Sequence, residues 1–183
     1  MYIAGAWTDG QSTMDVRNPF DGSVVDTVPR GTAEDVDRAL ESAARGARVM
    51  AQLTGYERYE ILHRVADLIV ANADGLANSL THEQGKILAE ARIEVERASE
   101  IFYLSGEEAK RLGGEVVPLE GGPGVKGKLG FTLRVPCGVV AAVTPFNFPL
   151  HLVGHKVGPA LAGGNAVVVK PASDTPLSAL RLV

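Results

Sequence analysis

The chain has 183 residues, of which 45% are hydrophobic and 22% are charged, and its formal net charge is −4. This composition is typical of a globular domain and excludes a fibrous or largely disordered chain. Acidic and basic residues are mixed, so no basic stretch suits nucleic acid or an anionic membrane surface, and no apolar run approaches the roughly 20 residues that span a bilayer.

The first third of the chain is predicted to pass from short strands and turns into helices. A β-prone run, residues 23–28, precedes a helix that begins after Thr32, whose hydroxyl and Asp35 form a variant of the capping box. Apolar residues at helical spacing predict a second helix from about Tyr56 to Asn72. Its apolar face is expected to hold Ile61, Leu62, Val65, Leu68 and Ile69.

Two further helices are expected before residue 113. Asp74 is the predicted N-cap of the shorter one, which ends near Gly85. The longer one covers about residues 87–112 and is expected to stop at left-handed residues Gly113-Gly114. The charged residues here are interpreted as a solvated face, because they lie far along the chain from the loops considered below: Glu83, Glu90, Glu94 and Arg97.

The last third of the chain predicts the fold class. Alternation over residues 126–135 predicts a strand with one solvated face. Two apolar runs, 139–143 and 166–169, are typical of parallel strands buried on both faces, and a helix is expected between them at about 150–161. Strand, helix and strand form a βαβ unit. The expected fold is therefore α/β, with N-terminal helices followed by part of a Rossmann-like parallel sheet.

Two loops follow the predicted parallel strands, residues 144–149 and 170–176. In open α/β sheets, ligands bind beyond the carboxyl ends of the strands, so both loops are candidates for a site. The first loop lacks the Gly-x-Gly-x-x-Gly turn of a standard dinucleotide site. Asn147 stands between Pro145 and Pro149, where it is either a positioned hydrogen-bond donor or a structural Asx turn.

The stretch from Pro136 to Leu180 resembles the aldehyde dehydrogenase superfamily. It contains in order Pro-Cys-Gly-Val-Val, Thr-Pro-Phe-Asn-Phe-Pro-Leu, Lys-Val-Gly-Pro-Ala-Leu-Ala-Gly-Gly-Asn and Val-Val-Lys-Pro-Ala-Ser-Asp-Thr-Pro-Leu. Looser agreement at residues 18–22 and 83–86 extends the resemblance over essentially the whole chain. It implies oxidation of a small aldehyde to a carboxylic acid with NAD or NADP.

In that family a cysteine thiolate attacks the aldehyde, and the resulting thiohemiacetal gives a hydride to the nicotinamide. A glutamate-activated water then hydrolyses the thioester. Asn147 matches the amide donor that stabilises the oxyanion. The positions that match cofactor contacts are Val143, Thr144, Pro145 and Phe146 on the nicotinamide side, and Lys170, Ala172 and Ser173 at the adenosine ribose.

Ser173 departs from the Glu that NAD-preferring members often carry at this position. A serine lacks the charge that repels a 2′-phosphate, so the resemblance implies that NADP is accepted.

Phe148, Leu152 and His155 match the substrate-tunnel side of the family. Succinate-semialdehyde enzymes carry Arg where His155 stands, and the absence of that Arg argues against a dicarboxylic semialdehyde. His155 also suits a packed or hydrogen-bonded histidine. Lys156 matches a lysine proposed for proton relay in some members.

The single cysteine, Cys137, is not expected to be the nucleophile, because it precedes a strand and has no neighbouring base in the sequence. His63, His82 and His151 show no metal-ligand spacing, so no metal site is predicted. One cysteine and no signal-peptide pattern favour a cytoplasmic protein.

The resemblance also divides the chain. Residues 1–125 and 135–183 match parts of the cofactor-binding domain, and residues 126–134 match the start of the arm that joins subunits, so the full-length protein is expected to form homodimers or homotetramers. The family's catalytic Cys and Glu lie beyond the matched region. The chain is therefore expected to be an N-terminal fragment that is inactive alone. The alternatives are a non-catalytic cofactor-binding or interaction module, and an acylating or acyl-phosphate-reducing relative.

Overall fold

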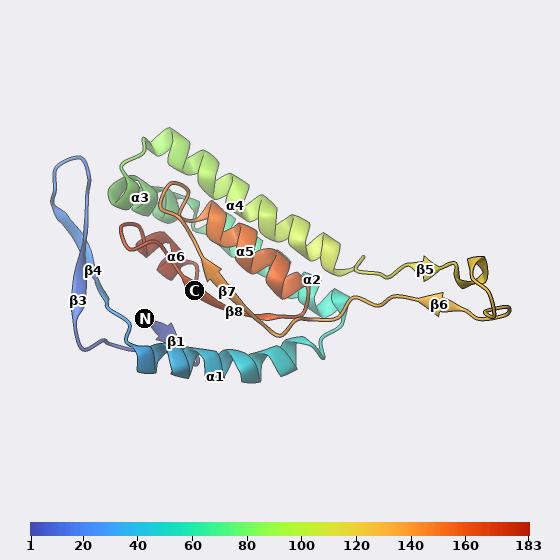
Figure 1. The fold of residues 1–183 in the computed structure, drawn as a ribbon. Coiled ribbons are helices and arrows are strands. Elements are labelled where there is room, and N and C mark those ends of the chain that lie inside the picture. Colours follow the sequence, from blue (N-terminus) through green and yellow to red (C-terminus); the bar gives the residue numbers. More distant parts are fainter.

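The computed structural model describes residues 1–183, and its N-terminal elements follow local sequence signals (Figure 1). Strands β1 (Tyr2–Ile3) and β2 (Ala6–Trp7) form one antiparallel pair, and β3 (Thr13–Arg17) and β4 (Val24–Pro29) form another. Helix α1 (Ala33–Met50) begins with the predicted capping box, in which the Asp35 amide donates to the Thr32 hydroxyl at 3.3 Å.

The main hydrophobic core lies between α2 (Gly55–Ala71), α3 (Ala73–Gln84), α4 (Leu88–Ala109) and α5 (His151–Ala162). Its largest fully buried apolar side chains are Phe102, Leu62, Leu80 and Leu150. The predicted face of α2 is only partly buried, since Leu62 and Ile69 are in the core while Leu68 is 52% exposed. No helix is long and apolar enough to cross a membrane.

Two predicted helix ends are wrong. The N-cap of α3 is Asn72, without a side-chain cap, and Asp74 instead pairs with Arg92 of α4 at 3.1 Å. Helix α4 ends at Ala109, before Gly113-Gly114, and neither glycine has a positive φ. Gly114 is required for another reason, because a Cβ there would lie 1.6 Å from the carbonyl oxygen of Thr132. The predicted end of α3 at Gly85 is confirmed, with φ +84°.

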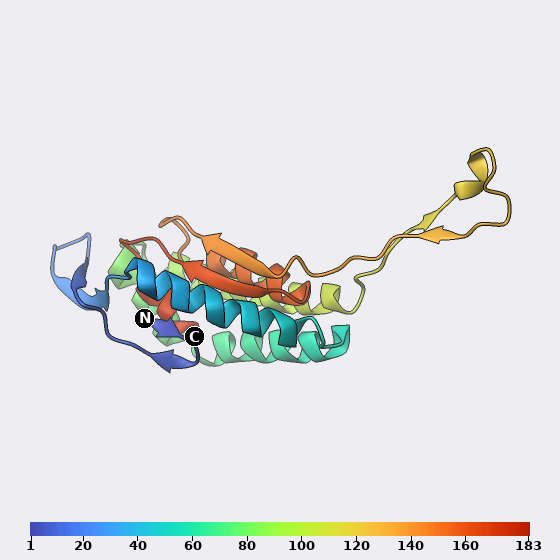
Figure 2. The same cartoon turned by 60° about the horizontal axis from the view of Figure 1, so that its bottom comes forward.

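The predicted βαβ unit is confirmed. Strands β7 (Val139–Val143) and β8 (Ala166–Lys170) are parallel, with α5 between them in the chain, and α1 and α5 both pack on this pair (Figure 2). The predicted burial of both faces is wrong for β7, since Val143 is 64% exposed and Ala142 alone is fully buried. The reason is that β7 has one strand neighbour only. Helix α6 (Leu177–Arg181) ends the fold.

Residues after α4 form an arm that projects away from the helices and the parallel sheet (Figures 1 and 2). Its strands, β5 (Val116–Val117) and β6 (Gly130–Phe131), are antiparallel, and the 3-10 helix η1 (Leu119–Gly121) lies between them in the chain. The strand predicted over residues 126–135 is therefore only two residues long. Its partner β5 has only two residues, and Gly127 adopts a positive φ of 74°, which interrupts extended backbone.

Candidate functional site

The structure brings the two predicted loops together at one edge of the parallel sheet. Val143 and Lys170 are partners in the register, so the loops that follow them leave the same edge. The Thr144 amide donates to the Lys170 carbonyl at 3.3 Å, and the Thr175 hydroxyl donates to the Phe146 carbonyl at 3.4 Å. The candidate residues on both loops therefore surround a common edge, as the βαβ prediction required.

Asn147 lies at a cavity of about 380 Å³, called here the Asn147 cavity. Its lining comprises Gln84, Lys86, Glu90, Ile93, Glu94, Arg97, Asn147 and Phe148. The side-chain amide of Asn147 makes no hydrogen bond within the chain. Asn18 differs, because its Oδ1 accepts from the Phe20 amide at 3.0 Å in an Asx turn. The Asn147 amide is thus free to meet a ligand.

A buried ion pair holds the backbone at Asn147. The Lys86 ammonium pairs with the Glu94 carboxylate, and their side chains are 7% and 0% exposed. Lys86 Nζ also donates to the Asn147 carbonyl at 3.2 Å and lies 4.5 Å from the centre of the Phe148 ring. Lys86 therefore links Glu94 of α4 to the Asn147 loop, which it contacts at the Asn147 carbonyl and at the Phe148 ring.

Glu94 and Glu83 cap the helices that follow the two loops. Glu94 Oε1 accepts from the Leu150 and His151 amides at 3.0 and 3.1 Å, at the start of α5. Glu83 accepts from the Leu177 and Ser178 amides at 2.6 and 2.8 Å, at the start of α6. A carboxylate satisfies the free amides of a helix N-terminus and complements its dipole.

The interpretation of Glu83 and Glu94 as a solvated face is therefore wrong, because they are only 3% and 2% exposed. The partners that bury them lie 94 and 56 residues away in the chain, so local periodicity does not reveal them. One signal was present. Glu94 shares a helical stripe with Ala91 and Ala98, both fully buried. Burial raises the pKa of the Glu83 carboxyl, against the opposing effect of its hydrogen bonds to Ser178 and Leu177.

The residues matched to the ribose lie at the end of β8 and on the loop after it. Lys170 Nζ donates to the Ser173 hydroxyl at 3.4 Å, and both side chains are exposed while Ala172 is partly buried. On the neighbouring loop, Pro145 and Phe146 are exposed and Thr144 is buried, with its hydroxyl oxygen lacking any partner. Exposed polar groups thus stand at the end of β8 and on the loop after it, whereas the Thr144 hydroxyl on the other loop is buried.

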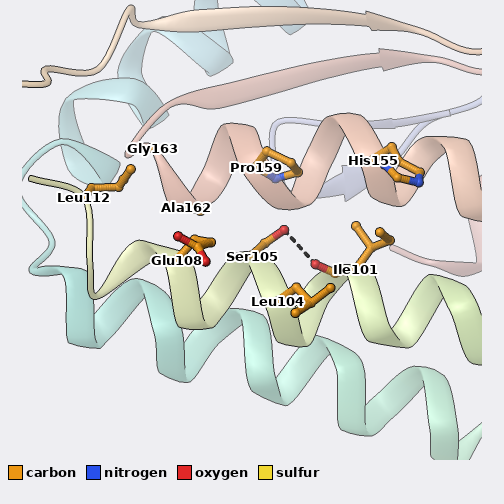
Figure 3. Close-up of a pocket in the computed structure, with 9 residues that line it drawn as sticks. All are labelled: Ile101, Leu104, Ser105, Glu108, Leu112, His155, Pro159, Ala162 and Gly163. Carbon is orange, nitrogen blue, oxygen red and sulfur yellow. Dashed lines mark hydrogen bonds between the residues drawn. The ribbon is translucent and has the colours of Figure 1, made fainter.

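The residues matched to the substrate tunnel do not share one cavity. Phe148 lines the Asn147 cavity, whereas His155 lines a separate groove of about 300 Å³ between α4 and α5 (Figure 3). His155 Nε2 lies 3.0 Å from the Nε2 of His151, one turn earlier, and burial lowers the pKa of His151. Leu152 is partly buried, and Lys156 is exposed.

Cys137 is exposed at the amino end of β7, the opposite edge of the sheet from Asn147. It therefore does not face the Asn147 loop. No group of three or more His, Cys, Asp or Glu side chains is arranged to hold a metal ion.

A family model described as the aldehyde dehydrogenase family matches residues 7–183. The 3-sulfolactaldehyde dehydrogenase of Priestia aryabhattai is 44% identical over 182 residues, which cover 100% of this chain and 38% of that protein. Aspartate-semialdehyde dehydrogenase 1 of Pseudomonas canavaninivorans is 46% identical over 93% of this chain and 36% of its own. D-glyceraldehyde dehydrogenase (NADP(+)) of Picrophilus torridus is 40% identical over 100% of this chain and 37% of that protein.

Solved structures agree with these relatives. Aldehyde dehydrogenase 21 from Physcomitrella patens, in complex with the reaction product succinate, matches with a TM-score of 0.95 and 40% identity, over 100% of this chain and 38% of that one. PnpE in complex with nicotinamide adenine dinucleotide matches with a TM-score of 0.93 and 36% identity, over 99% of this chain and 37% of that one. The chain spans little more than a third of the length of these proteins. From the family match and from these likenesses in sequence and fold, the chain belongs to the aldehyde dehydrogenase family.

Proposed function

We propose that the protein containing this chain oxidises an aldehyde to a carboxylic acid with NAD or NADP, and that Asn147 donates a hydrogen bond to the oxyanion formed in the reaction. The observation that carries the proposal is the state of Asn147. Its amide has no partner in the chain and lies at a cavity, while its backbone is fixed by Lys86.

This arrangement suits oxyanion stabilisation. Attack on an aldehyde carbon places negative charge on the carbonyl oxygen, and a neutral N–H donor held in place stabilises that charge without reorganising. The buried Lys86–Glu94 pair and the α5 cap restrict the loop on both sides of Asn147. The reaction also requires a nucleophile and a base. We assign these roles to the Cys and the Glu that the family carries beyond the region matched by this chain.

The free donors at the sheet edge fit a dinucleotide. The exposed Lys170 and Ser173 offer an ammonium and a hydroxyl to ribose hydroxyls or to a 2′-phosphate. A dinucleotide held by these residues would supply the hydride acceptor. Relatives support both cofactors, since PnpE was crystallised with nicotinamide adenine dinucleotide and the Picrophilus torridus enzyme is named for NADP.

The proposed function is tested on the full-length protein with propanal and each cofactor, by following the absorbance of the reduced nicotinamide. We expect aldehyde-dependent reduction without added coenzyme A. Reduction that requires coenzyme A would identify an acylating relative instead, and no reduction by a folded, cofactor-binding protein with a panel of aldehydes would leave a non-catalytic binding module.

Ser173 provides a test of cofactor choice. We expect Ser173→Glu to weaken NADP binding by about 10-fold or more, because the new carboxylate repels the 2′-phosphate, and to leave NAD binding intact. Fluorescence titration of both cofactors measures this ratio, with Ser23→Glu in the distant β3–β4 turn as the control. An equal loss of affinity for both cofactors would show that Ser173 does not lie beside the 2′ position of the ribose.

A further inference from the structure

We propose that Arg97 binds an acidic group of the substrate, so that the preferred substrates are aldehydes with a second, anionic group. This inference rests on the proposed function and names the substrate class of the same site. Arg97 extends from α4 one turn after Glu94 and lines the Asn147 cavity together with Asn147 and Phe148. A molecule in this cavity would therefore contact Arg97 and the oxyanion donor at once.

The charges of the cavity favour an anion at Arg97. The other cation, Lys86, is already neutralised by Glu94. Arg97 forms no ion pair and donates no hydrogen bond to the chain, although the acidic residues Glu94, Glu96 and Glu100 are near it in sequence. A guanidinium that has no partner inside the protein is available for bidentate contact with a carboxylate or sulfonate.

Two other ionisable groups bear on the charge near Arg97: Glu90, which lines the cavity, and His151, which does not. Glu90 lines the cavity but precedes Arg97 by seven residues on α4, which separates them by about 10 Å along the helix axis. His151 starts α5, and its pKa is lowered by burial first and also by the charges of His155 and Arg97. The lowered pKa of His151 disfavours its charged form, and Glu90 is about two helical turns away, so neither group forms an ion pair with Arg97.

The expectation drawn from His155, that a dicarboxylic semialdehyde is disfavoured, is replaced by this assignment. His155 lines the α4–α5 groove and not the Asn147 cavity, so a cation at that position is not the only way to bind an acidic group (Figure 3). Two relatives are named for acidic aldehydes, 3-sulfolactaldehyde and aspartate semialdehyde, and the Physcomitrella patens structure holds succinate.

The test compares two aldehydes of the same length on the full-length protein. Succinate semialdehyde carries a carboxylate that butanal lacks. We expect Arg97→Gln to lower kcat/KM for succinate semialdehyde by about 10- to 100-fold, mainly through KM, because a hydrogen-bonded charge pair is lost. Activity with butanal should stay within about twofold, and Arg97→Lys should restore part of the loss. Arg92→Gln, also exposed on α4, is the matched control and should change neither value.

Equal losses for both aldehydes in Arg97→Gln, or a wild-type protein that does not prefer succinate semialdehyde, would overturn the assignment. Calorimetric titration with succinate gives a readout that does not depend on turnover. Binding to the wild type that is lost in Arg97→Gln supports the assignment even if no aldehyde is oxidised, a result that would sink only the proposed function. Equal binding by both proteins, or binding by neither, overturns the role of Arg97.

Discussion

Among single residues, Lys86 and Glu94 show how the Asn147 loop is held. Both side chains are almost completely buried, so their charges were removed from water on folding. Such a pair is costly to break from one side only, because the remaining charge stays buried without a partner. Glu94 also accepts two amides of α5, and Lys86 also donates to the Asn147 carbonyl. The pair therefore serves the geometry of the loop more than overall stability.

The coupling of this pair can be measured by a double-mutant cycle. We expect Glu94→Gln and Lys86→Met each to lower the free energy of unfolding by about 3–5 kcal/mol, and the double variant to lose much less than the sum. Urea unfolding gives the three values. The exposed pair Arg111–Glu108 is the control and should show almost no coupling. Additive losses at Lys86 and Glu94 would mean that the two charges do not stabilise each other.

Among the elements, the two helices that follow the loops share one device. The N-cap residues of α5 and α6 are Leu150 and Pro176, neither of which provides a side-chain cap. The missing acceptors come from α4 and α3, through Glu94 and Glu83. A carboxylate from α4 or α3 thus fixes the C-terminal end of each loop. The position of the two loops therefore depends on how these helices pack beside the sheet.

The Glu83 cap predicts a dependence of stability on pH. Its pKa is raised above the ordinary value of 4.5, so the folded state binds the proton more tightly than the unfolded state. The stability that Glu83 contributes is therefore fully present below the unfolded pKa and is lost as the pH rises through the folded pKa.

Urea unfolding of the wild type and of Glu83→Gln between about pH 4 and pH 8 tests this statement. We expect the wild type to lose stability relative to Glu83→Gln as the pH rises, because the amide does not ionise. The exposed Glu108→Gln serves as the control. The raised pKa would be contradicted if the difference in the free energy of unfolding between the two proteins stayed constant with pH. It would also be contradicted if the difference increasingly favoured the wild type as the pH rose.

The sequence predicts elements better than the contacts between them. The capping box at Thr32, the end of α3 at Gly85 and the βαβ unit depend on neighbours in the chain, and all are confirmed. The burial of Glu94 depends on α5, more than 50 residues away, and no periodicity within α4 states which helix will cover it. The same limit applies to Arg97, whose place at the cavity follows from the packing of α4 beside the Asn147 loop.

At the scale of the whole molecule, the projecting arm stands out because it does not pack against the helices or the parallel sheet. Apolar side chains on it are largely exposed: Val116 73%, Leu129 78%, Phe131 63%, Leu133 72% and Val135 78%. A surface of this kind marks an interaction site. We propose, in line with the resemblance for residues 126–134, that the arm joins subunits of the full-length protein.

The arm proposal predicts a change in assembly. We expect the double variant Phe131→Glu and Leu133→Glu to shift the full-length protein from a dimer or tetramer to a monomer, since two buried charges oppose the interface. Light scattering after size-exclusion chromatography measures the mass. Val70→Glu on α2, where Val70 is 55% exposed, is the control. An unchanged mass in the arm variant would place the interface elsewhere.

The role proposed for Asn147 is tested most directly by the turnover number of Asn147→Ala in the full-length protein, measured together with its affinity for NAD and NADP. We expect kcat to fall by about 100- to 1,000-fold, because one oxyanion donor is lost, while both affinities stay within about twofold. The exposed Asn78→Ala should leave kcat unchanged. A kcat for Asn147→Ala equal to that of the wild type, with cofactor binding intact, would contradict the assignment of Asn147 as the oxyanion donor.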